Sequence, residues 1–478
     1  MSISPARTIA FDALRRVEGE GAYASDVLHV QLGAGVKPED AALATELTLG
    51  VLRWRRLLDF LLEQLIKKSV EKLDLPVALA LRLGLYQLRF LQRIPSRAAV
   101  NESVELVKRA RKTSAASLVN AVLRRAATEA KESAEKFLPP NISPTERIAI
   151  LHSHPTWLVE RWLEQFGEPR TIALLEANNR APRLTCSVHD ANQREETLTE
   201  LAKSGLRVEP GQLLKTAFAV SGGSPIRTDA FRRGAISIQD EASQAVPLLL
   251  AVQPGQRVLD LCAAPGGKTP PLVRASGKTG LVIAADRHAH RLRAMRAQFE
   301  RLHLSEIAPV ELVELDAQKP LPFPAKFDRI LVDAPCSGTG TLARHPEIRW
   351  RLKPEQVAGL HGLQVAILTS ALAALAPGGR IVYSTCSLEP EENENVITEA
   401  FGRPTVSSFV GAGLKPAQPA GVHLNLVAAA EGAGTLASYL AAGVAAASLF
   451  DPAGHFRTIP GQQSSDGFFA AILESARV

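Results

Sequence analysis

The chain has 478 residues, of which 46% are hydrophobic and 22% are charged. This composition is typical of a globular protein, and the length suggests about three domains that each bury a core. The first 21 residues carry charges throughout and contain no apolar run, which argues against a secretory signal peptide. The stretch 426–450 is mostly alanine and glycine, whereas a membrane span needs about 20 strongly apolar residues. We therefore expect a cytoplasmic protein without membrane contact.

The formal net charge of +6 is concentrated in the N-terminal third, because residues 1–140 hold 22 Lys/Arg and 16 Asp/Glu. Two basic clusters lie there, RWRR at 53–56 and VKRARK at 107–112. Such clusters contact the phosphate backbone in RNA-binding proteins. They also occur as solvated faces of ordinary helices, and the sequence leaves both interpretations open.

Residues 1–140 are expected to form an all-helical domain. Apolar residues repeat at three- and four-residue spacing over 41–66 and 77–93, which predicts two long helices. The pattern continues in two further segments, for which Asn101 and Ser114 are the predicted starts. Three prolines soon afterwards mark the end of the domain.

Residues 141–240 mix both types of element. The stretch HPTWLVERWLEQFG (154–167) has the pattern of an amphipathic helix, and short β-rich runs follow at 183–189, 205–211 and 235–239. We expect a small α+β domain that links the first domain to the third.

From residue 241 to residue 478 the sequence alternates strand-like runs with helical stretches and loops. The strand-like runs are apolar and cover 257–261, 281–286, 310–316, 329–335 and 380–387. Such alternation predicts a doubly wound, Rossmann-like α/β domain with a mostly parallel sheet. Ligands of that architecture bind at the carboxyl ends of the strands, so the loops after these strands form the candidate site. Residues 401–454 form an alanine- and glycine-rich insertion whose structure the sequence leaves open.

The first of these loops lies in LDLCAAPGGKT (259–269), which ends like the phosphate loop of nucleoside-triphosphate enzymes. That loop needs a glycine five residues before its Gly-Lys pair, and Cys262 occupies this position. That the chain is an ATPase or helicase therefore stays only as an alternative hypothesis. A helix is expected to start near Thr269, with two prolines in its first turn. The residues predicted to contact a cofactor are Cys262, Ala263, Ala264, Pro265, Gly266, Gly267 and Lys268.

Two acids at predicted strand ends extend this site. Asp286 lies 19 residues after Gly267, where a dinucleotide-type site holds a ribose hydroxyl. Asp316 ends the third strand-like run and is a candidate acceptor for an adenine amino group. The pattern predicts a cofactor that carries a nucleoside; tight turns and helix caps are the structural alternative.

The chain has four cysteines, and no two of them form a CxxC pair. Neither a structural zinc site nor a disulfide framework is expected, and we predict no bound metal. Cys336 follows the fourth strand-like run in DAPCSGTG, and Cys386 lies at the end of the fifth in STCS. Together with Asp333 these thiols are expected at the rim of one crevice, as reactive groups. Cys186 is expected to be structural, and Cys262 to contribute backbone to the cofactor loop.

These motifs resemble those of the cytosine-5 RNA methyltransferases that use S-adenosylmethionine. The resemblance rests on LDLCAAPGGKT, on DAPCSGTG followed by RHPEIRW, and on YSTCS, in that order. The helical first domain resembles the NusB family of RNA-binding proteins. FRRGAISIQDEASQ (231–244) and the closing DGFFAAIL (466–473) fit the same pattern. Over nearly the whole chain, 401–454 excepted, the combination is similar to bacterial small-subunit rRNA cytosine-5 methyltransferases of the Sun/Fmu (RsmB) type.

The resemblance implies an enzyme that transfers a methyl group from S-adenosylmethionine to carbon 5 of a cytosine in 16S rRNA. It implies Cys386 as the nucleophile that adds to carbon 6, Cys336 as a group that helps product release, and Asp333 as a stabiliser of developing charge. It also implies a monomer whose first two domains grip RNA around a looped or flipped-out base. Two other readings stay open: another RNA, such as tRNA or 23S rRNA, as the substrate, and a non-catalytic NusB-like RNA-binding factor.

Overall fold

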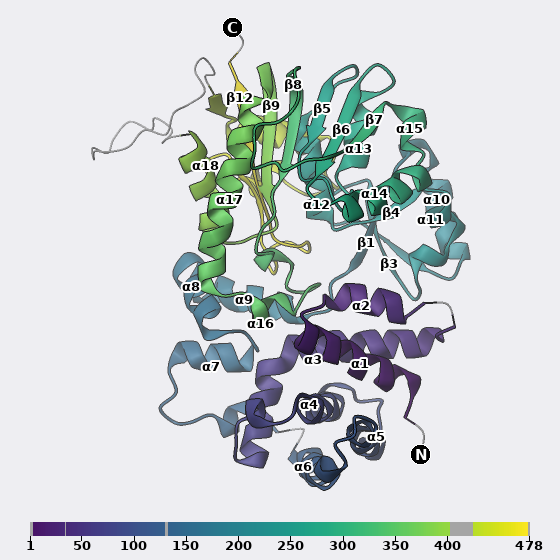
Figure 1. Ribbon diagram of the computed structural model, residues 1–478, viewed down its shortest axis with the longest axis vertical. Helices are drawn as coiled ribbons and strands as arrows, with labels where there is room; N and C mark the ends of the chain where they lie inside the picture. The colour runs from purple at the N-terminus through teal and green to yellow at the C-terminus, as the bar shows by residue number, and fades with distance from the viewer. Residues whose placement is uncertain (1–2, 34, 130–131, 402–423, 477–478) are drawn as a thin grey trace. The chain divides into compact units, whose positions relative to one another are not determined.

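The computed structural model describes residues 3–33, 35–129, 132–401 and 424–476. The chain divides into two compact units, which are coloured by residue number in Figure 1. Unit 1 consists of Met1–Ala181 with Leu342–Arg351, and unit 2 of Pro182–Thr341 with Leu352–Val478. Each unit has its own hydrophobic core, and a short piece of the C-terminal half belongs to unit 1.

The described part of unit 1 contains helices and no strand, as the sequence predicts. Its helices are α1 (Pro5–Glu20), α2 (Ala24–Gln31), α3 (Pro38–Ile66), α4 (Leu75–Phe90), α5 (Ser96–Arg109), α6 (Ala116–Glu129), α7 (Pro144–Leu151), α8 (Thr156–Phe166), α9 (Glu168–Asn179) and α16 (Ile348–Arg351). The predicted helix start at Asn101 is wrong, because α5 begins at Ser96 and already buries Ala99 and Val100. Ser114 lies in a short 3-10 turn directly before α6.

The core of unit 1 lies where α3 and α4 pack closely together. Every residue of α4 from Val77 to Gln87 is buried. Gly50 of α3 permits the close approach, since a Cβ atom there would lie 2.1 Å from Cζ of Tyr86. Any larger side chain at position 50 would therefore push the two helices apart.

The first sheet of unit 2 is antiparallel, with the strand order β2–β3–β1–β4. Its elements are β1 (Leu184–Val188), α10 (Arg194–Lys203), β2 (Arg207–Pro210), β3 (Ala217–Ser221), α11 (Asp229–Arg232) and β4 (Ile236–Ile238). The three predicted strands are confirmed as β1, β2 and β4. Strand β3 escapes prediction because residues 217–220 are all buried, so the run lacks the alternation of a half-buried strand.

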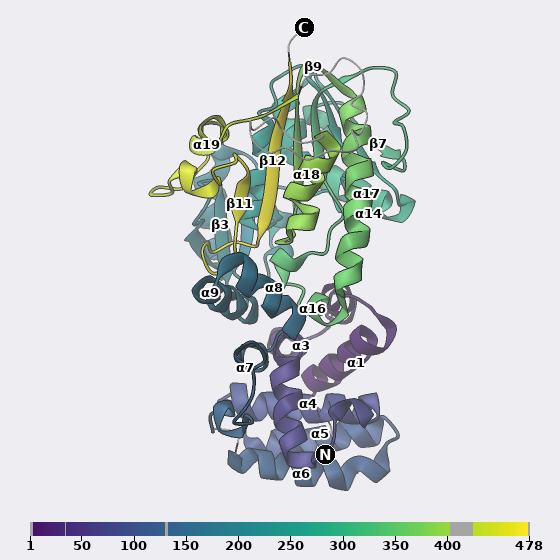
Figure 2. The same ribbon diagram turned by 90° about the vertical axis from the view of Figure 1, so that its left-hand side faces the viewer.

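The second sheet of unit 2 has the strand order β10–β12–β9–β8–β5–β6–β7, with β11 paired to β12. Its strands are β5 (Arg257–Asp260), β6 (Leu281–Asp286), β7 (Val310–Glu314), β8 (Phe327–Asp333), β9 (Leu375–Thr385), β10 (Leu424–Leu426), β11 (Phe456–Thr458) and β12 (Phe468–Ser475). The five predicted strands are confirmed as the parallel set β5 to β9. The closing DGFFAAIL supplies β12, which pairs antiparallel with β9 and lies beside β11 in Figure 2.

Helices cover both faces of this sheet because successive side chains of a strand point to opposite faces. One face packs against α12 (Glu241–Ala245), α13 (Thr269–Ser276) and α14 (Ala289–Arg301), and the other against α17 (Pro354–Ala373) and α18 (Glu394–Phe401). Within β5, for example, Val258 belongs to the first core cluster and Leu259 to the second. The carboxyl ends of the parallel strands therefore meet at one edge, where their loops are free to form a site.

Helix α17 is the one helix among the described residues that is long and apolar enough to cross a membrane. It packs on β8 and β9, as Figure 1 shows, and the core helix of a globular domain has the same length and composition. Of the insertion 401–454, residues 402–423 lie outside the described residues. The remainder forms β10, helix α19 (Ala429–Ala437) and a 3-10 turn, and Leu436 and Leu449 pack into the core of unit 2.

Candidate active site

The loop between β5 and α13 carries the predicted cofactor residues at the edge of the large sheet. The backbone N–H of Ala263 donates to the carbonyl of Ala285, which ties the loop to the end of β6. Gly266 has a φ of +97°, and a Cβ atom there would lie 3.2 Å from Cγ of Met295, so this turn requires glycine. The predicted helix start is confirmed, because α13 begins at Thr269 with both prolines in its first turn.

The two predicted cofactor acids are held differently. Asp286 is buried at the end of β6, where it accepts from the backbone N–H of His288 at 2.9 Å and from Nη1 of Arg291 at 3.3 Å. Arg291 also donates to the carbonyl of Ala264 at 2.7 Å, so the acid and the loop are fixed together. Asp316 does not end a strand as predicted, because β7 stops at Glu314 and leaves this carboxylate in the following loop.

A third acid, Asp260, is not predicted by the sequence because it stands inside an apolar run. It is fully buried at the end of β5, and its Oδ2 accepts from the hydroxyl of Thr269 at 2.7 Å. Its Oδ1 has no hydrogen-bond partner among the described residues. Burial raises the pKa of this carboxyl to about 7. The unpartnered oxygen marks a place where a bound molecule can donate a hydrogen bond.

Lys268 joins the cofactor loop to the ends of β8 and β9. Its Nζ atom lies 2.6 Å from Oδ2 of Asp333 and 5.0 Å from the ring centroid of Phe468. The hydroxyl of Ser384 donates to the other oxygen of Asp333 at 2.8 Å. Burial lowers the pKa of Lys268, but the charges of Asp333 and Cys386 outweigh it, so the net shift is upward and the ammonium stays charged.

The structure brings the two predicted reactive thiols into contact. The Sγ atoms of Cys336 and Cys386 lie 3.3 Å apart. Their loops are fastened to each other, because the N–H of Gly340 donates to the carbonyl of Cys386 at 2.9 Å. The hydrogen bond to Cys386, together with burial, raises the pKa of the Cys336 thiol well above its ordinary value. Cys336 therefore keeps its proton and can donate it toward Cys386.

Glu392 connects the loops that carry these thiols, and it is fully buried. Its Oε1 accepts from the N–H of Ser337 at 2.8 Å, and its Oε2 accepts from the hydroxyl of Ser387 at 2.5 Å and from that of Ser337. Gln364 of α17 donates to Oε1 at 3.0 Å and to the carbonyl of Pro335 at 2.8 Å. One carboxylate thus bonds the residue that follows each thiol. The acid-rich run after STCS was the only sequence signal for it.

The other two cysteines lie apart from this pair. Cys186 is fully buried in the core of the small sheet, where burial raises its pKa to about 12. Cys262 packs against the core cluster under α17, and burial raises the pKa of this thiol as well. Among the described residues, one cluster could hold a metal ion by its ligand atoms, namely Glu394, Asp451 and His455. Its two carboxylates already form ion pairs with the guanidinium of Arg457.

The basic cluster RWRR is not an exposed patch, and its interpretation as an RNA contact stays a prediction. Arg53 is 4% exposed and donates from Nη2 to the carbonyl of Ala343 at 2.8 Å. Arg56 pairs with Glu146 and donates to backbone and hydroxyl oxygens nearby. In the second cluster, 107–112, three cations are exposed, Lys108, Arg109 and Arg111, and the interpretation of their role stays open.

The motif RHPEIRW belongs to unit 1, although it follows the Cys336 loop in the sequence. Arg349 is fully buried and donates to Oδ1 of Asn179 at 2.8 Å and to the carbonyl of Asn178 at 3.0 Å. The indole N–H of Trp350 donates to the carbonyl of Leu52 at 2.6 Å. In this chain the motif therefore holds together helices of unit 1.

Three family models match the chain. Residues 4–128 match the NusB family, residues 154–227 match the ferredoxin-like domain of RsmF/B-like methyltransferases, and residues 247–474 match the 16S rRNA methyltransferase RsmB/F family. The expected order of a NusB-like domain, a small α+β domain and a Rossmann-like methyltransferase domain is thereby confirmed.

Relatives and solved structures agree with these matches. The ribosomal RNA small subunit methyltransferase B of Pseudomonas putida is 35% identical over 83% of this chain and 89% of its own length. The protein of the same name from Citrobacter koseri is 34% identical over 90% of this chain and 96% of its own length. The structure of PH0851 has a TM-score of 0.76 at 24% identity, covers 99% of both chains, and shows the same fold. A methyltransferase homolog from Pyrococcus horikoshii is 28% identical, with a TM-score of 0.55 over 70% of this chain and 100% of its own. The chain, with its NusB-like and ferredoxin-like domains ahead of a methyltransferase domain, belongs to the 16S rRNA methyltransferase RsmB/F family.

Proposed function

We propose that this methyltransferase transfers a methyl group to carbon 5 of a cytosine in small-subunit rRNA, through a covalent bond between Cys386 and the base. The observation that carries the proposal is the pair of thiols 3.3 Å apart beside the Lys268–Asp333 ion pair. Transfer to a ring nitrogen or to a ribose hydroxyl needs no thiol nucleophile, whereas carbon 5 of cytosine does not attack a methyl sulfonium unaided. The small-subunit RNA is proposed because the Pseudomonas putida and Citrobacter koseri relatives carry that substrate in their names.

S-adenosylmethionine is the proposed methyl donor, bound along Cys262–Lys268. The residues present fit a nucleoside cofactor, since Gly266 makes the positive-φ turn of the loop, Asp286 is fixed beside it, and the buried Oδ1 of Asp260 has no hydrogen-bond partner among the described residues. Asp286 is proposed to accept from the ribose and Asp316 to lie near the adenine. The NSun6 protein of Pyrococcus horikoshii, whose structure was solved with the S-adenosylmethionine analogue SFG, shares this fold with a TM-score of 0.53. The cofactor supplies an electrophilic methyl group, and the protein supplies everything else.

Cys386 is the proposed nucleophile. Addition of its thiolate to carbon 6 of cytosine breaks the ring double bond and moves electron density to carbon 5, which then attacks the methyl group. Two groups adjoin its sulfur: the ammonium of Lys268, and the thiol of Cys336, whose Sγ lies 3.3 Å away.

Cys336 is the proposed base that removes the carbon 5 proton after methyl transfer. In the resting site its pKa is raised first by the hydrogen bond to Cys386 and then by burial and by the charge of Cys386. Once Cys386 forms its bond to carbon 6, the hydrogen bond and the repulsion both vanish. Cys336 then becomes more acidic at the stage that needs a base. Loss of the carbon 5 proton restores the ring double bond and expels the Cys386 thiolate, and the whole reaction releases one proton to solvent.

Asp333 is proposed to orient the base. Each of its oxygens already accepts one hydrogen bond, from Ser384 and from Lys268, and a carboxylate can accept about four. The remaining capacity suits the exocyclic amino group of cytosine, which distinguishes this base from uracil. Because Lys268 and Ser384 hold Asp333 in place, the acceptor is set before the base arrives.

We further propose that the division near residues 140 and 240 separates the domains that hold the RNA from the domain that performs the transfer. The NusB-like and ferredoxin-like domains would grip the RNA around the target. Carbon 6 is shielded inside a duplex, so the target is expected to be looped or flipped out. The protein is proposed to act as a monomer without a metal ion.

The test uses labelled S-adenosylmethionine with protein-free 16S rRNA, 23S rRNA and total tRNA, followed by bisulfite sequencing of the product. We expect label in 16S rRNA at one cytosine that becomes resistant to deamination, and none with Cys386→Ala. Label in 16S rRNA without a resistant cytosine would contradict carbon 5 as the acceptor. Preferential labelling of 23S rRNA or tRNA would contradict the substrate. The Cys186→Ala variant is the control for loss of a thiol.

A further inference from the structure

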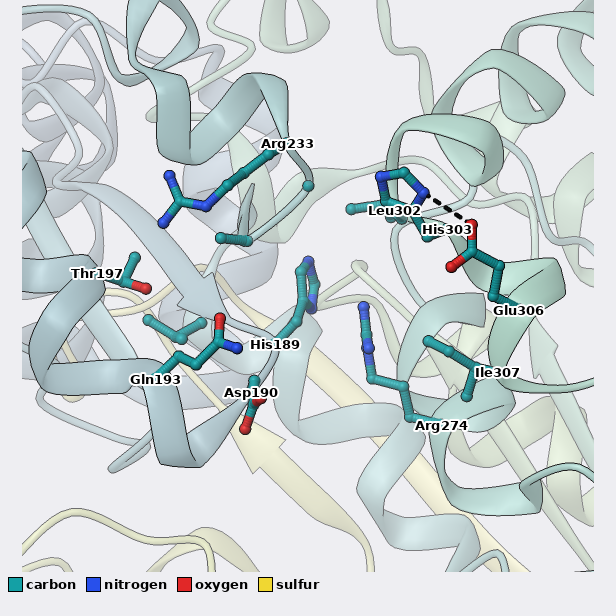
Figure 3. A pocket seen from close by; sticks show the side chains of 13 residues that line it. His189, Asp190, Gln193, Thr197, Arg233, Arg274, Leu302, His303, Glu306 and Ile307 are labelled. Atoms are coloured by element: carbon teal, nitrogen blue, oxygen red, sulfur yellow. Dashed lines mark hydrogen bonds and ion pairs between the residues drawn. The ribbon is translucent and has the colours of Figure 1, made fainter.

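A cavity of about 230 Å³ opens in unit 2, away from the cofactor loop. Its walls come from the ferredoxin-like sheet with α10 on one side, and from α13 and α15 (Leu304–Ile307) of the methyltransferase domain on the other. Figure 3 shows His189 and Arg274 side by side, both directed into the open space between Arg233 and His303. None of the residues considered in the catalytic site lines this cavity.

Two polar groups in the wall lack partners. Thr197 of α10 is fully buried, and its hydroxyl makes no hydrogen bond within the described residues. The Nε atom of Arg274 is buried and equally unpartnered, and the described residues offer this guanidinium no ion pair. Burial lowers the pKa of Arg274, and the nearby charge of Asp190 opposes this shift only in part. Unsatisfied buried donors are uncommon in native proteins, so these two groups are suited to bind a molecule that enters the cavity.

The remaining groups limit what that molecule can be. Burial and the charges of Arg274 and Arg301 lower the pKa of His189 to about 3, so its ring is neutral and can act as donor or acceptor. Arg233 is already paired with Glu200 and lies at the wall. The carboxylate of Asp190 completes the rim and repels a bare polyanion. A nucleotide satisfies both charged residues. Its single phosphate can pair with the guanidinium of Arg274, and a ribose hydroxyl or a base amino group can donate to the carboxylate of Asp190.

The position relative to the cofactor loop favours RNA over a free nucleotide. Ala235 lines the cavity just before β4. Four residues later, just past the end of β4, the side-chain amide of Gln239 lies beside Gly267, where an added Cβ would come within 3.1 Å of Nε2. Four residues of strand span roughly 13 Å. A nucleotide seated in the cavity is therefore within a few nucleotides of a base at the proposed reaction site.

We propose that this cavity, lined by His189, Thr197 and Arg274, holds one unpaired nucleotide that flanks the target in the RNA substrate, with Arg274 on its phosphate. The proposal rests on the proposed function for the nature of the substrate, but it does not depend on which atom is methylated. The cavity would set the register of the RNA strand relative to the cofactor loop. Its volume is small for a complete cofactor and large for a water or a chloride ion.

The test compares Arg274→Ala with Lys278→Ala. Lys278 is exposed, follows the same helix by two residues and does not line the cavity, so its variant removes an equal charge nearby. Filter binding of a 16S rRNA transcript at several salt concentrations, the KM for RNA, and the calorimetric affinity for S-adenosylmethionine are measured for both. For Arg274→Ala we expect RNA affinity to fall about tenfold or more, KM to rise with kcat little changed, and the salt slope to drop by about 0.7. Cofactor affinity and Tm should match the wild type, because the buried Nε atom of Arg274 has no hydrogen-bond partner to lose among the described residues.

Further arms separate the possible outcomes. Arg274→Lys should recover part of the affinity, since it restores the charge without the planar guanidinium. Equal RNA binding by Arg274→Ala and Lys278→Ala would overturn the proposal. An Arg274→Ala variant that loses affinity for inorganic phosphate but keeps its affinity for RNA would also overturn it, as the cavity would then be a site for a free anion. A wild type that binds the transcript but methylates another atom would refute only the carbon 5 assignment.

Discussion

The Sγ atoms of Cys336 and Cys386 lie 3.3 Å apart, on two loops that backbone hydrogen bonds fasten to each other. A disulfide requires a separation of about 2.05 Å, so the sulfurs need to move by only about 1.3 Å to form one. We therefore expect the proposed nucleophile and the proposed base of one reaction to be sensitive to oxidation as a pair.

Mild oxidation is expected to inactivate the enzyme reversibly. Diamide should withdraw two electrons and two protons from the thiols and join them, and dithiothreitol should restore methyl transfer. Mass spectrometry of non-reduced peptides should show Cys336 bonded to Cys386. Cys336→Ser should resist this cross-link. Inactivation of the wild type with both thiols still free to alkylation would contradict the prediction.

Replacing Glu392 by glutamine should slow catalysis without weakening cofactor binding. The amide cannot accept from Ser337 and Ser387 as the carboxylate does, so the two thiol loops lose their shared fixed point. We expect kcat to fall by about tenfold to a hundredfold, with an unchanged KM for S-adenosylmethionine, since small misplacements of reacting groups are costly.

A control variant and the Tm of Glu392→Gln separate positioning by Glu392 from simple unfolding. Glu355→Gln removes the charge of an exposed acid in the first turn of α17, outside the bonds that Glu392 makes to the thiol loops. It should retain wild-type kcat. A Glu392→Gln protein with wild-type kcat, or with a Tm too low for folding at the assay temperature, would remove the positioning role.

The buried acid Asp260 predicts a specific pH dependence of stability. Its pKa is about 7 in the folded chain and about 3.9 in an unfolded one, so the folded state binds the proton more tightly. Stability from this group is fully present below about pH 4 and is lost as pH rises towards 7. The free energy of unfolding falls by up to about 4 kcal/mol over this pH range.

Asp260→Asn lacks this titration. The Tm difference between the variant and the wild type should therefore move in the variant's favour between pH 4 and pH 7 and level off above. Thermal scans without cofactor measure it directly. A difference that stays constant over this window would contradict a raised pKa at Asp260.

Loss of the Arg349 side chain should destabilise unit 1. Its guanidinium donates to several buried acceptors, including Asn178 and Asn179, and Arg349→Met leaves them unsatisfied. Removing one partner of such a buried network costs about 3 kcal/mol or more. Arg124→Met, at an exposed position of α6, should change stability by less than about 0.5 kcal/mol. Equal thermal shifts for the two variants would contradict the structural role of Arg349.

The predictable part of the fold is the part that local pattern encodes. The parallel strands were predictable because each is a short apolar run bounded by turn residues, and α13 because glycines precede two prolines. Strand β3 was hidden because it is buried on both sides, and the start of α5 because no side-chain cap marks Ser96. The buried state of Arg53 was invisible, since its partner Ala343 lies 290 positions later in the chain.

The residues of the candidate site also fall into a group that the sequence predicts and a group that it does not. Both thiols and Asp333 were predictable because parallel strands bring their carboxyl ends together. The contacts of Asp260 and Glu392 depend on loops that only the folded chain brings side by side, and the cavity beside Arg274 forms where two domains meet. Residue type and spacing along the chain do not encode such contacts.

In the proposed mechanism Cys386 bonds the base and Cys336 completes the reaction. The most direct measurement mixes wild type, Cys386→Ala and Cys336→Ala with labelled 16S rRNA and S-adenosylmethionine, and looks for a protein–RNA adduct that survives denaturation. We expect Cys336→Ala to accumulate the adduct, Cys386→Ala to form none, and the wild type to turn over without accumulating it. An adduct with Cys386→Ala and none with Cys336→Ala would reverse the two roles, and methyl transfer by Cys386→Ala at the wild-type rate would exclude the covalent mechanism.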